Sequence, residues 1–253
     1  MIRLFLSPEN LSSDKITITG DQAKHLSVVL RVKPGDPVTI FDGQGHKYEC
    51  NVLKCHKKEV IAEQISRTDY SVESPVSITL VQGIAKGEKM DLIIQKATEL
   101  GVSRIVPVIT ERAQIRHTEK TERWKKIALS ASQQSGRDKI PEIDEPAGFE
   151  EFLYQQTRSP HPDLINEKPE SRLGIIFSEH KQEQNLKKIL TSLNNAKKLT
   201  LLIGPEGGFS KDEISITVEK GFIEASLGPG ILRTETAPLA ALSIIQYELG
   251  DIG

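Results

Sequence analysis

LLIGPEGGFS, at residues 201–210, is the stretch that decides the fold of this chain. Its first three residues are apolar and typical of a buried strand, and a glycine-rich turn follows them directly. Ser210 and Glu213 then have the spacing of a capping box, so a helix is expected to begin here. A strand that enters a helix through a tight turn is the repeating unit of parallel α/β sheets.

A second turn of this kind lies at residues 227–236, which read LGPGILRTET. Thr236 is expected to cap the next helix, and Pro238 falls in the first helical turn, where its missing N–H costs little. That helix is expected to end at Gly250. Two such turns place two loops at one edge of a sheet, which is where open α/β sheets bind ligands.

Strands and helices alternate over much of the chain from residue 76 onward. Apolar runs predict strands at 78–82, 104–109, 174–177 and 199–203, and 3.6-residue periodicity predicts helices at 90–100 and 121–134. We expect residues 143–173 to form a loop, whose polar, proline-rich part is 158–172. The pattern predicts a parallel α/β domain over residues 76–253.

Residues 1–70 have a different pattern. Short β-branched runs predict strands at the N-terminus and at 16–19, 37–41, 47–53 and 60–65, while 21–30 is the one helical stretch. The sequence therefore predicts a small β-barrel domain over residues 1–70. A polar linker at 71–75 is expected to join it to the α/β domain.

The bulk composition indicates a globular protein of the reducing cytoplasm. The chain has 253 residues, of which 37% are hydrophobic and 27% charged. No apolar run approaches the roughly 18 residues of a membrane helix, so no membrane partner is expected. The only cysteines are Cys50 and Cys55, and the six histidines are scattered, so no metal site is expected.

Charge is unevenly distributed along the chain. The net charge is −2, but residues 86–140 hold 12 Lys/Arg against 7 Asp/Glu, a net +5, and residues 201–253 hold 3 against 8, a net −5. The basic segment is compatible with a phosphate-contacting face and equally with an ordinary solvated helix surface.

The two turns lack the marks of a phosphate site. Gly204, Gly207 and Gly208 allow positive φ and close approach of the backbone to a ligand. However, neither G-x-G-x-x-G nor a Walker motif is present, and Glu206 would repel a phosphate. A cationic or hydroxyl-bearing ligand fits better. In the second turn, Arg233 and Glu235 form either a structural ion pair or part of a site.

The segments Ile203–Gly208 and Leu227–Ala237 resemble the two cofactor-binding motifs of the SPOUT methyltransferases. The closer resemblance is to the RsmE-type subfamily, the 16S ribosomal RNA uracil-N3 methyltransferases. It extends over nearly the whole chain, apart from the loop at 143–173. Further similar segments are His25–Arg31, Pro34–Asp36, Phe41–Gly43, Lys86–Met90, Gln95–Gly101, Glu111–Arg112, Gln134, Arg137 and Pro141–Glu142.

The resemblance implies a trefoil-knotted α/β domain, an exception to the rule that chains are unknotted. It also implies a PUA-like RNA-binding barrel, a homodimer, and S-adenosylmethionine as methyl donor with S-adenosylhomocysteine as product. The expected partner is 16S ribosomal RNA in the assembled small subunit. The implied cofactor-binding residues are Ile203, Gly204, Pro205, Glu206, Gly207, Gly208, Leu227, Gly228, Ile231, Leu232 and Thr236.

Methyl transfer to uracil N3 sets the chemistry expected of the site. A sulfonium methyl is already activated, so no metal is needed, whereas N3 must lose a proton. We expect Arg233 to stabilise negative charge on a uracil carbonyl oxygen, and Glu235 to orient Arg233 or to assist proton removal. The target base must leave its stack. Phosphate contacts are expected from Arg31, Lys86, Lys89, Arg112 and Arg137.

Three other functions remain as alternatives. The chain could be an RNA-binding module whose α/β domain has lost catalysis, although the intact Arg233–Glu235 segment argues against it. It could be a SPOUT enzyme that modifies a ribose or base of transfer RNA or 23S ribosomal RNA. It could also be a nucleotide-dependent α/β enzyme, against which the missing Walker and Rossmann fingerprints weigh.

Overall fold

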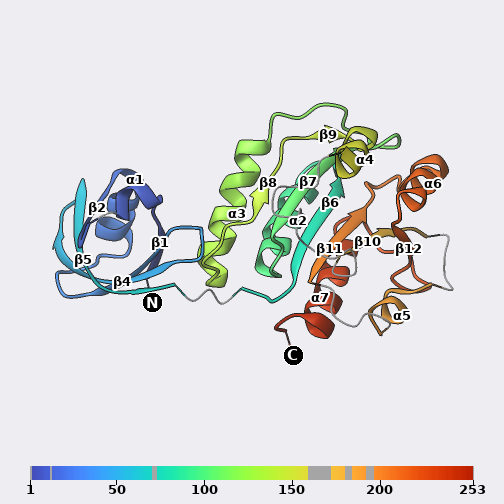
Figure 1. Ribbon diagram of the computed structural model, residues 1–253. Helices are drawn as coiled ribbons and strands as arrows, with labels where there is room; N and C mark the ends of the chain where they lie inside the picture. The colour runs from blue at the N-terminus through green and yellow to red at the C-terminus, as the bar shows by residue number, and fades with distance from the viewer. Residues whose placement is uncertain are drawn as a thin grey trace. The chain divides into compact units, whose positions relative to one another are not determined.

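The computed structural model describes residues 2–11, 13–69, 73–158, 172–179, 184–191 and 197–252. The chain divides into two compact units (Figure 1). The first consists of Met1–Glu73 and Leu129–Ile140, and the second of Ser74–Ala128 and Pro141–Gly253. The first unit therefore includes a segment from the middle of the chain, which a boundary near residue 70 leaves out.

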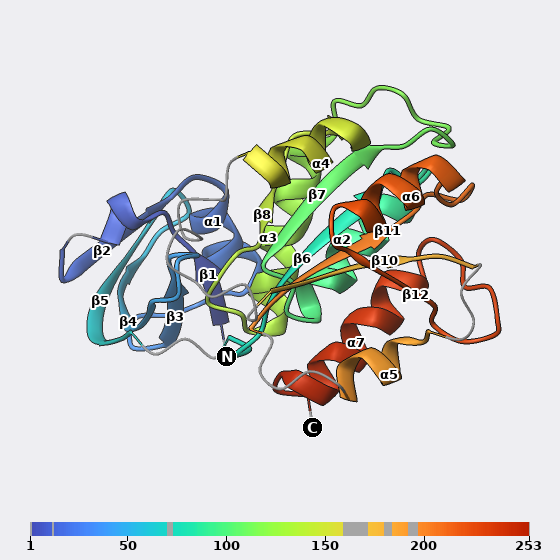
Figure 2. The same ribbon diagram turned by 45° about the vertical axis from the view of Figure 1, so that its right-hand side comes forward.

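The first unit is a five-stranded sheet with the order β1-β3-β4-β5-β2. β1 runs parallel to β3, and the other pairs are antiparallel. The sheet curls around a core that includes Ile16, Ile18, Ile40 and Val60 (Figure 2). The elements are β1 (Ile2–Phe5), a 3-10 turn (Pro8–Leu11), β2 (Lys15–Thr19), α1 (Gly20–Lys24), a π-helical turn (His25–Val29), β3 (Pro37–Phe41), β4 (Lys47–Cys55) and β5 (Glu59–Thr68).

Hydrogen bonds and ion pairs join segment 129–140 to the rest of the first unit. Arg3 donates from Nη2 to the carbonyl of Arg137 at 2.5 Å and to Asp138 Oδ1 at 2.6 Å. Arg137 in turn donates from Nη2 to Glu73 Oε2 at 2.5 Å. These contacts join residues more than sixty positions apart, so sequence periodicity gives no sign of them.

The second unit is a parallel seven-stranded sheet with the order β12-β10-β11-β6-β7-β8, and β9 also pairs with β7. This confirms the predicted α/β class. The strands are β6 (Ser77–Gly83), β7 (Arg104–Ile109), β8 (Glu142–Ile143), β9 (Ala147–Gly148), β10 (Arg172–Phe177), β11 (Lys198–Ile203) and β12 (Ile223–Ala225).

Helices cover both faces of this sheet. α2, α5 and α7 pack together, and α4 packs with α6 on the other face (Figure 2). On the α4–α6 side of the sheet lies a hydrophobic core in which Phe149, Phe152 and Phe209 pack on Val81 and Leu202. The helices are α2 (Lys89–Glu99), α3 (Thr121–Ser135), α4 (Phe149–Arg158), α5 (Leu186–Thr191), α6 (Lys211–Glu219) and α7 (Ala237–Leu249).

The structure corrects the prediction of a loop at 143–173. α4 and β9 occupy part of 143–173, where a loop was expected, and residues 159–171 of that stretch lie outside the described residues. The buried Phe149, Phe152 and Leu153 follow helical spacing and could have revealed α4. The prediction that Thr236 is the N-cap of α7 is confirmed, although its side chain makes no capping hydrogen bond.

Candidate active site

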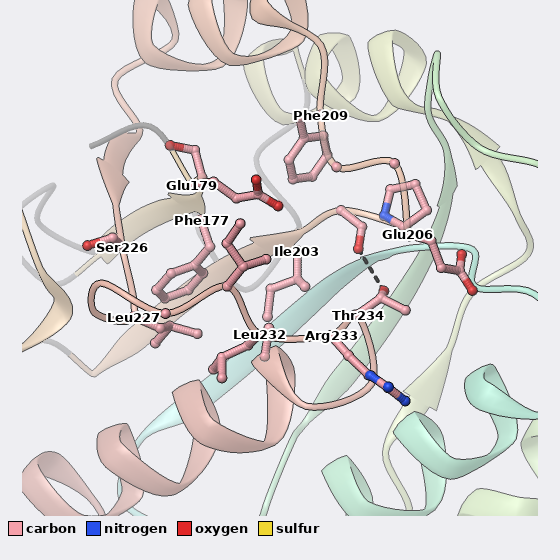
Figure 3. A pocket seen from close by; sticks show the side chains of 18 of the residues that line it. Phe177, Glu179, Ile203, Glu206, Phe209, Ser226, Leu227, Leu232, Arg233 and Thr234 are labelled. Carbon is pink, nitrogen blue, oxygen red and sulfur yellow. Dashed lines mark hydrogen bonds between the residues drawn. The ribbon is translucent and has the colours of Figure 1, made fainter. Parts of the chain in front are cut away.

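A cavity of about 630 Å³ opens beyond the carboxyl ends of β10, β11 and β12. Both glycine turns line it, as the sequence predicted for this edge of the sheet (Figure 3). One side is apolar, with Phe177, Ile203 and Leu227. The other side is charged, with Glu206 and Arg233. Such a volume suits a small-molecule ligand with an apolar part and a polar part.

The first turn, between β11 and α6, is closed by its own backbone. A Cβ atom on Gly204 would lie 2.9 Å from the backbone of Gly208, so no larger residue fits at 204 without displacement. Gly208 itself has φ +64°, a conformation that favours glycine. The predicted capping box is present: Ser210 N donates to Glu213 Oε2 at 2.8 Å, and Glu213 N donates to Ser210 Oγ at 3.2 Å.

The second turn, between β12 and α7, is tied to the first by side chains. Thr234 Oγ1 donates to the Gly204 carbonyl at 2.8 Å, the bond dashed in Figure 3. Gln82, fully buried near the end of β6, donates from Nε2 to the Gly83 carbonyl at 3.0 Å and to Thr234 Oγ1 at 3.3 Å. Gln82 and Thr234 were not predicted from the sequence as site residues. A glutamine inside a buried strand was the available signal.

Lys89, the first residue of α2, joins both turns at the charged side. Its Nζ lies 3.0 Å from Glu206 Oε1 and 3.6 Å from Glu235 Oε2. The backbone N–H of Lys86 also donates to Glu206 Oε1, at 3.1 Å. The hydrogen bond with Glu206 raises the pKa of Lys89. Burial works to raise the pKa of Glu206, but hydrogen bonds from its own N–H, from Lys89 and from Lys86 lower it overall.

The catalytic candidates separate in the structure. Arg233 lines the cavity, and its guanidinium has no hydrogen-bond or ion-pair partner among the described residues. Glu235 is not among the residues that line the cavity; its Oε2 is buried and faces Lys89. No hydrogen bond or ion pair in the described part of the chain joins Glu235 to Arg233. A role of Glu235 in orienting Arg233 or in assisting proton removal stays a prediction.

The implied cofactor residues gather at the cavity with one exception. Thr236 does not line it, because it lies at the exposed start of α7. The other ten do: Ile203, Gly204, Pro205, Glu206, Gly207, Gly208, Leu227, Gly228, Ile231 and Leu232.

Five further residues that line the cavity were not predicted from the sequence. The strand β10 ends at Phe177, and Ser178 and Glu179 follow it. Phe209 lies at the end of the first turn, and Ser226 precedes the second. Ser226 Oγ is buried, and in the described structure it has no hydrogen-bond partner. The signal available was the predicted strand at 174–177, whose carboxyl end reaches the same sheet edge.

The five phosphate candidates fall into two groups. Lys86, Lys89 and Arg112 belong to the second unit, where Lys89 and Arg112 line the cavity. Arg31 and Arg137 belong to the first unit. Arg31 is exposed and has φ +54°, which is strained for a residue with a Cβ. Arg137 is only 9% exposed and forms an ion pair with Glu73, so its guanidinium is not available for a phosphate contact.

Two negative findings apply to the described residues. None of their helices has the length and apolar character needed to cross a membrane. No group of three or more His, Cys, Asp or Glu side chains among them is arranged to hold a metal ion.

Comparisons with known proteins match both units. A family model for the RNA methyltransferase domain matches residues 72–246, and a model for the RNA methyltransferase PUA domain matches residues 18–65. The ribosomal RNA small subunit methyltransferase E of Bacillus subtilis is 32% identical over 92% of this chain and 90% of its own length. The protein of that name from Aquifex aeolicus is 35% identical over 96% of this chain and 99% of its own length.

Solved structures agree with these sequence matches. A ribosomal RNA small subunit methyltransferase E from Neisseria gonorrhoeae, bound to S-adenosyl methionine, has a TM-score of 0.86 and 36% identity, with 100% of each chain covered. A putative methyltransferase from Legionella pneumophila, in complex with the same cofactor, has a TM-score of 0.83 and 33% identity, covering 99% of this chain and 98% of that one.

Proposed function

We propose that this chain, which belongs to the RNA methyltransferase family and within it to the ribosomal RNA small subunit methyltransferases E, transfers the methyl group of S-adenosylmethionine to N3 of a uridine in 16S ribosomal RNA. The observation that carries this proposal is that the two glycine turns line one cavity, with Arg233 at its charged side and without a partner among the described residues.

The residues at the cavity fit S-adenosylmethionine. Phe177, Ile203 and Leu227 form an apolar wall that would hold the adenine ring. Gly204 leaves the turn no room for a side chain, so its backbone can approach a ligand closely. The hydroxyl of Ser226 has no hydrogen-bond partner among the described residues. It would form a hydrogen bond with a polar group of the nucleoside, as donor or as acceptor.

The protein's own contribution is to position the base and to stabilise charge. S-adenosylmethionine supplies an activated methyl group: its carbon–sulfur bond breaks as the carbon bonds to N3, which leaves a neutral thioether. The guanidinium of Arg233 lines the cavity, has no partner among the described residues, and would stabilise the negative charge that uracil acquires when N3 loses its proton. Holding both reactants in one cavity provides the remaining advantage through proximity.

RNA recognition is assigned to both units. Arg112 and Lys86 lie at or beside the cavity and would contact phosphates near the target, after its base has left the stack. In the first unit, the PUA-like sheet and the exposed Arg31 would contact other parts of the RNA. The substrate in this proposal is 16S ribosomal RNA within the assembled small subunit, in the cytoplasm.

A homodimer and a trefoil knot also belong to this proposal. Leu92 on α2 and Ile244 and Tyr247 on α7 are 41%, 39% and 67% exposed, on two helices that pack together. A second copy of the chain would cover these apolar side chains. The knot rests on the family resemblance, and the sheet order is compatible with it, since β11, late in the chain, lies between the earlier β6 and β10.

Mass mapping of methylated uridines in small-subunit RNA tests the proposal. Small subunits from cells that lack the protein are incubated with the purified chain and S-adenosylmethionine. We expect one uridine of the 16S RNA to gain a methyl group at N3. Methylation only of transfer RNA or 23S RNA, or at a ribose, would refute the assigned substrate. Absence of cofactor binding in calorimetry would refute the activity altogether.

A further inference from the structure

Besides Arg233, the charged side of the cavity carries Lys89, whose ammonium is held by two carboxylates. Lys89 lines the cavity, and the two carboxylates that hold it come from different turns: Glu206 from the first and Glu235 from the second. Glu206 is itself held by the backbone N–H of Lys86. The ammonium is therefore placed by contacts to both turns, on a side chain that is 38% exposed.

We propose that Lys89 is a catalytic residue, which stabilises the deprotonated uracil together with Arg233; this rests on the proposed function. Glu206 and Glu235 then act as positioning residues for the Lys89 ammonium. The assignment replaces the expected phosphate contact of Lys89, and it gives Glu235 a role that suits its buried oxygen behind the cavity wall.

The chemistry of uracil calls for two cationic donors. N3 lies between the C2 and C4 carbonyls, so its proton passes to solvent and leaves a negative charge shared by N3 and both carbonyl oxygens. The N3 electron pair then forms the bond to the methyl carbon, and the pair of the broken carbon–sulfur bond stays on sulfur. One cation at each oxygen stabilises the charge along its whole extent.

Lys89 keeps a donor available for this purpose. An ammonium has three N–H donors. In the described structure only the contact to Glu206, at 3.0 Å, is a hydrogen bond, since Glu235 stands 3.6 Å away. Its pKa is raised by the hydrogen bond with Glu206, so it stays protonated at neutral pH. Glu206 and Glu235 are the charged residues that contact Lys89 in the described structure. Arg112, Arg233 and Glu179 also line the cavity, Glu179 on the Phe177 side (Figure 3).

The acidity of the substrate provides a direct test. Small-subunit particles are reconstituted with 16S transcripts that contain either uridine or 5-fluorouridine, whose N3 proton is more acidic. Single-turnover rates are measured for the wild type and for Lys89→Met. We expect about a 100-fold loss on uridine, and a loss smaller by about a factor of ten on 5-fluorouridine, because a more acidic base needs less help from a cation.

Matched variants separate this effect from general damage. Lys96→Met removes another lysine of α2, whose Nζ lies 2.9 Å from Glu99 Oε1 and which does not line the cavity. This variant should leave the rates unchanged. Lys89→Arg keeps the cation and should retain most of the rate on both substrates. Glu235→Gln should show a smaller loss than Lys89→Met, with the same dependence on fluorination. Calorimetry and thermal melting should show cofactor binding and folding preserved in Lys89→Met.

Several outcomes would overturn the inference. An equal loss on both RNAs would make Lys89 a phosphate contact, and a loss of cofactor affinity that accounts for the rate would make it part of the cofactor site. An unchanged rate would remove it from the mechanism. Each of these requires that the wild type methylates uridine N3; if the wild type fails on both RNAs, the proposed function itself is wrong.

Discussion

The two glycine turns at the cavity are built in different ways. The first turn is closed by backbone contacts, between Gly204 and Gly208, and by the capping box of Ser210. The second turn exposes its side chains: Ile231 is 73% exposed and Leu232 38% exposed, while only Thr234 is buried and reaches back to the first turn. One turn therefore supplies a fixed shape, and the other presents functional side chains against it.

The largest effect is expected in the second turn. Arg233→Ala should reduce the single-turnover rate by about 100-fold or more, since it removes a cation that lines the cavity. Cofactor affinity by calorimetry should change little, because Gly204 and its neighbours are untouched. A normal rate would exclude Arg233 from the mechanism, and an equal loss in cofactor affinity would make the two turns equivalent.

Glycine replacements test the rigid shape of the first turn. Gly204→Ala should weaken cofactor binding by roughly 1–3 kcal/mol, because its Cβ would lie 2.9 Å from the Gly208 backbone. Gly208→Ala is the matched control: nothing lies within 4 Å of its Cβ, and only the φ of +64° is strained, at about 1–2 kcal/mol. Calorimetry that found Gly208→Ala the more damaging would contradict the packing argument.

Thr234 tests how the two turns are joined. Thr234→Val keeps the shape but leaves the Gly204 carbonyl without its 2.8 Å hydrogen bond, which should cost about 1–3 kcal/mol. We expect both cofactor affinity and rate to fall, and Thr234→Ser to restore most of each. If Thr234→Ser is as poor as Thr234→Val, the methyl group rather than the hydroxyl joins the turns.

The capping box should matter for stability alone. Ser210→Ala should lower the free energy of unfolding by about 1 kcal/mol, because α6 loses the hydrogen bond to the Glu213 N–H. The rate at a temperature well below melting should stay the same. Denaturant unfolding measures the first effect, and a rate that falls with stability intact would show that the cap shapes the site.

The smallest effect concerns the pH dependence contributed by Glu206. Its pKa is lowered in the folded chain, so it contributes stability above its ordinary pKa, and that contribution is lost as pH falls through the folded pKa. Glu206→Gln should therefore melt below the wild type near neutral pH, with the gap closing on acidification below the ordinary glutamate range. A gap that stays constant with pH would mean that the carboxylate charge contributes nothing.

Local sequence signals predicted the elements that carry the site. The strands at 78–82 and 199–203 correspond to β6 and β11, and the helix at 90–100 to α2. Some missed elements are too short to show a period, such as β8 and β9 with two residues each and β12 with three, whereas α4 was missed although its apolar residues follow helical spacing. A strand of two residues is defined by its partner and not by its own pattern.

The phosphate candidates show the limit of reasoning from residue type. Five basic residues were taken as equivalent, yet Arg137 is buried against Glu73 and Lys89 is held by Glu206 and Glu235, while Arg31 and Arg112 remain exposed. A positive charge in the sequence indicates a possible anion contact. Its partner is decided by whatever acidic group the fold brings near.

The sequence by itself determined the first glycine turn, its capping box, the alternation of strands and helices, and the resemblance to a methyltransferase family. These depend on residues within a few positions of one another, where turn chemistry and periodicity act directly. Only the tertiary structure decided that Lys89 meets Glu206, 117 positions away, and that segment 129–140 completes the first unit. Such contacts follow from the order of strands in the sheet, which no local pattern specifies.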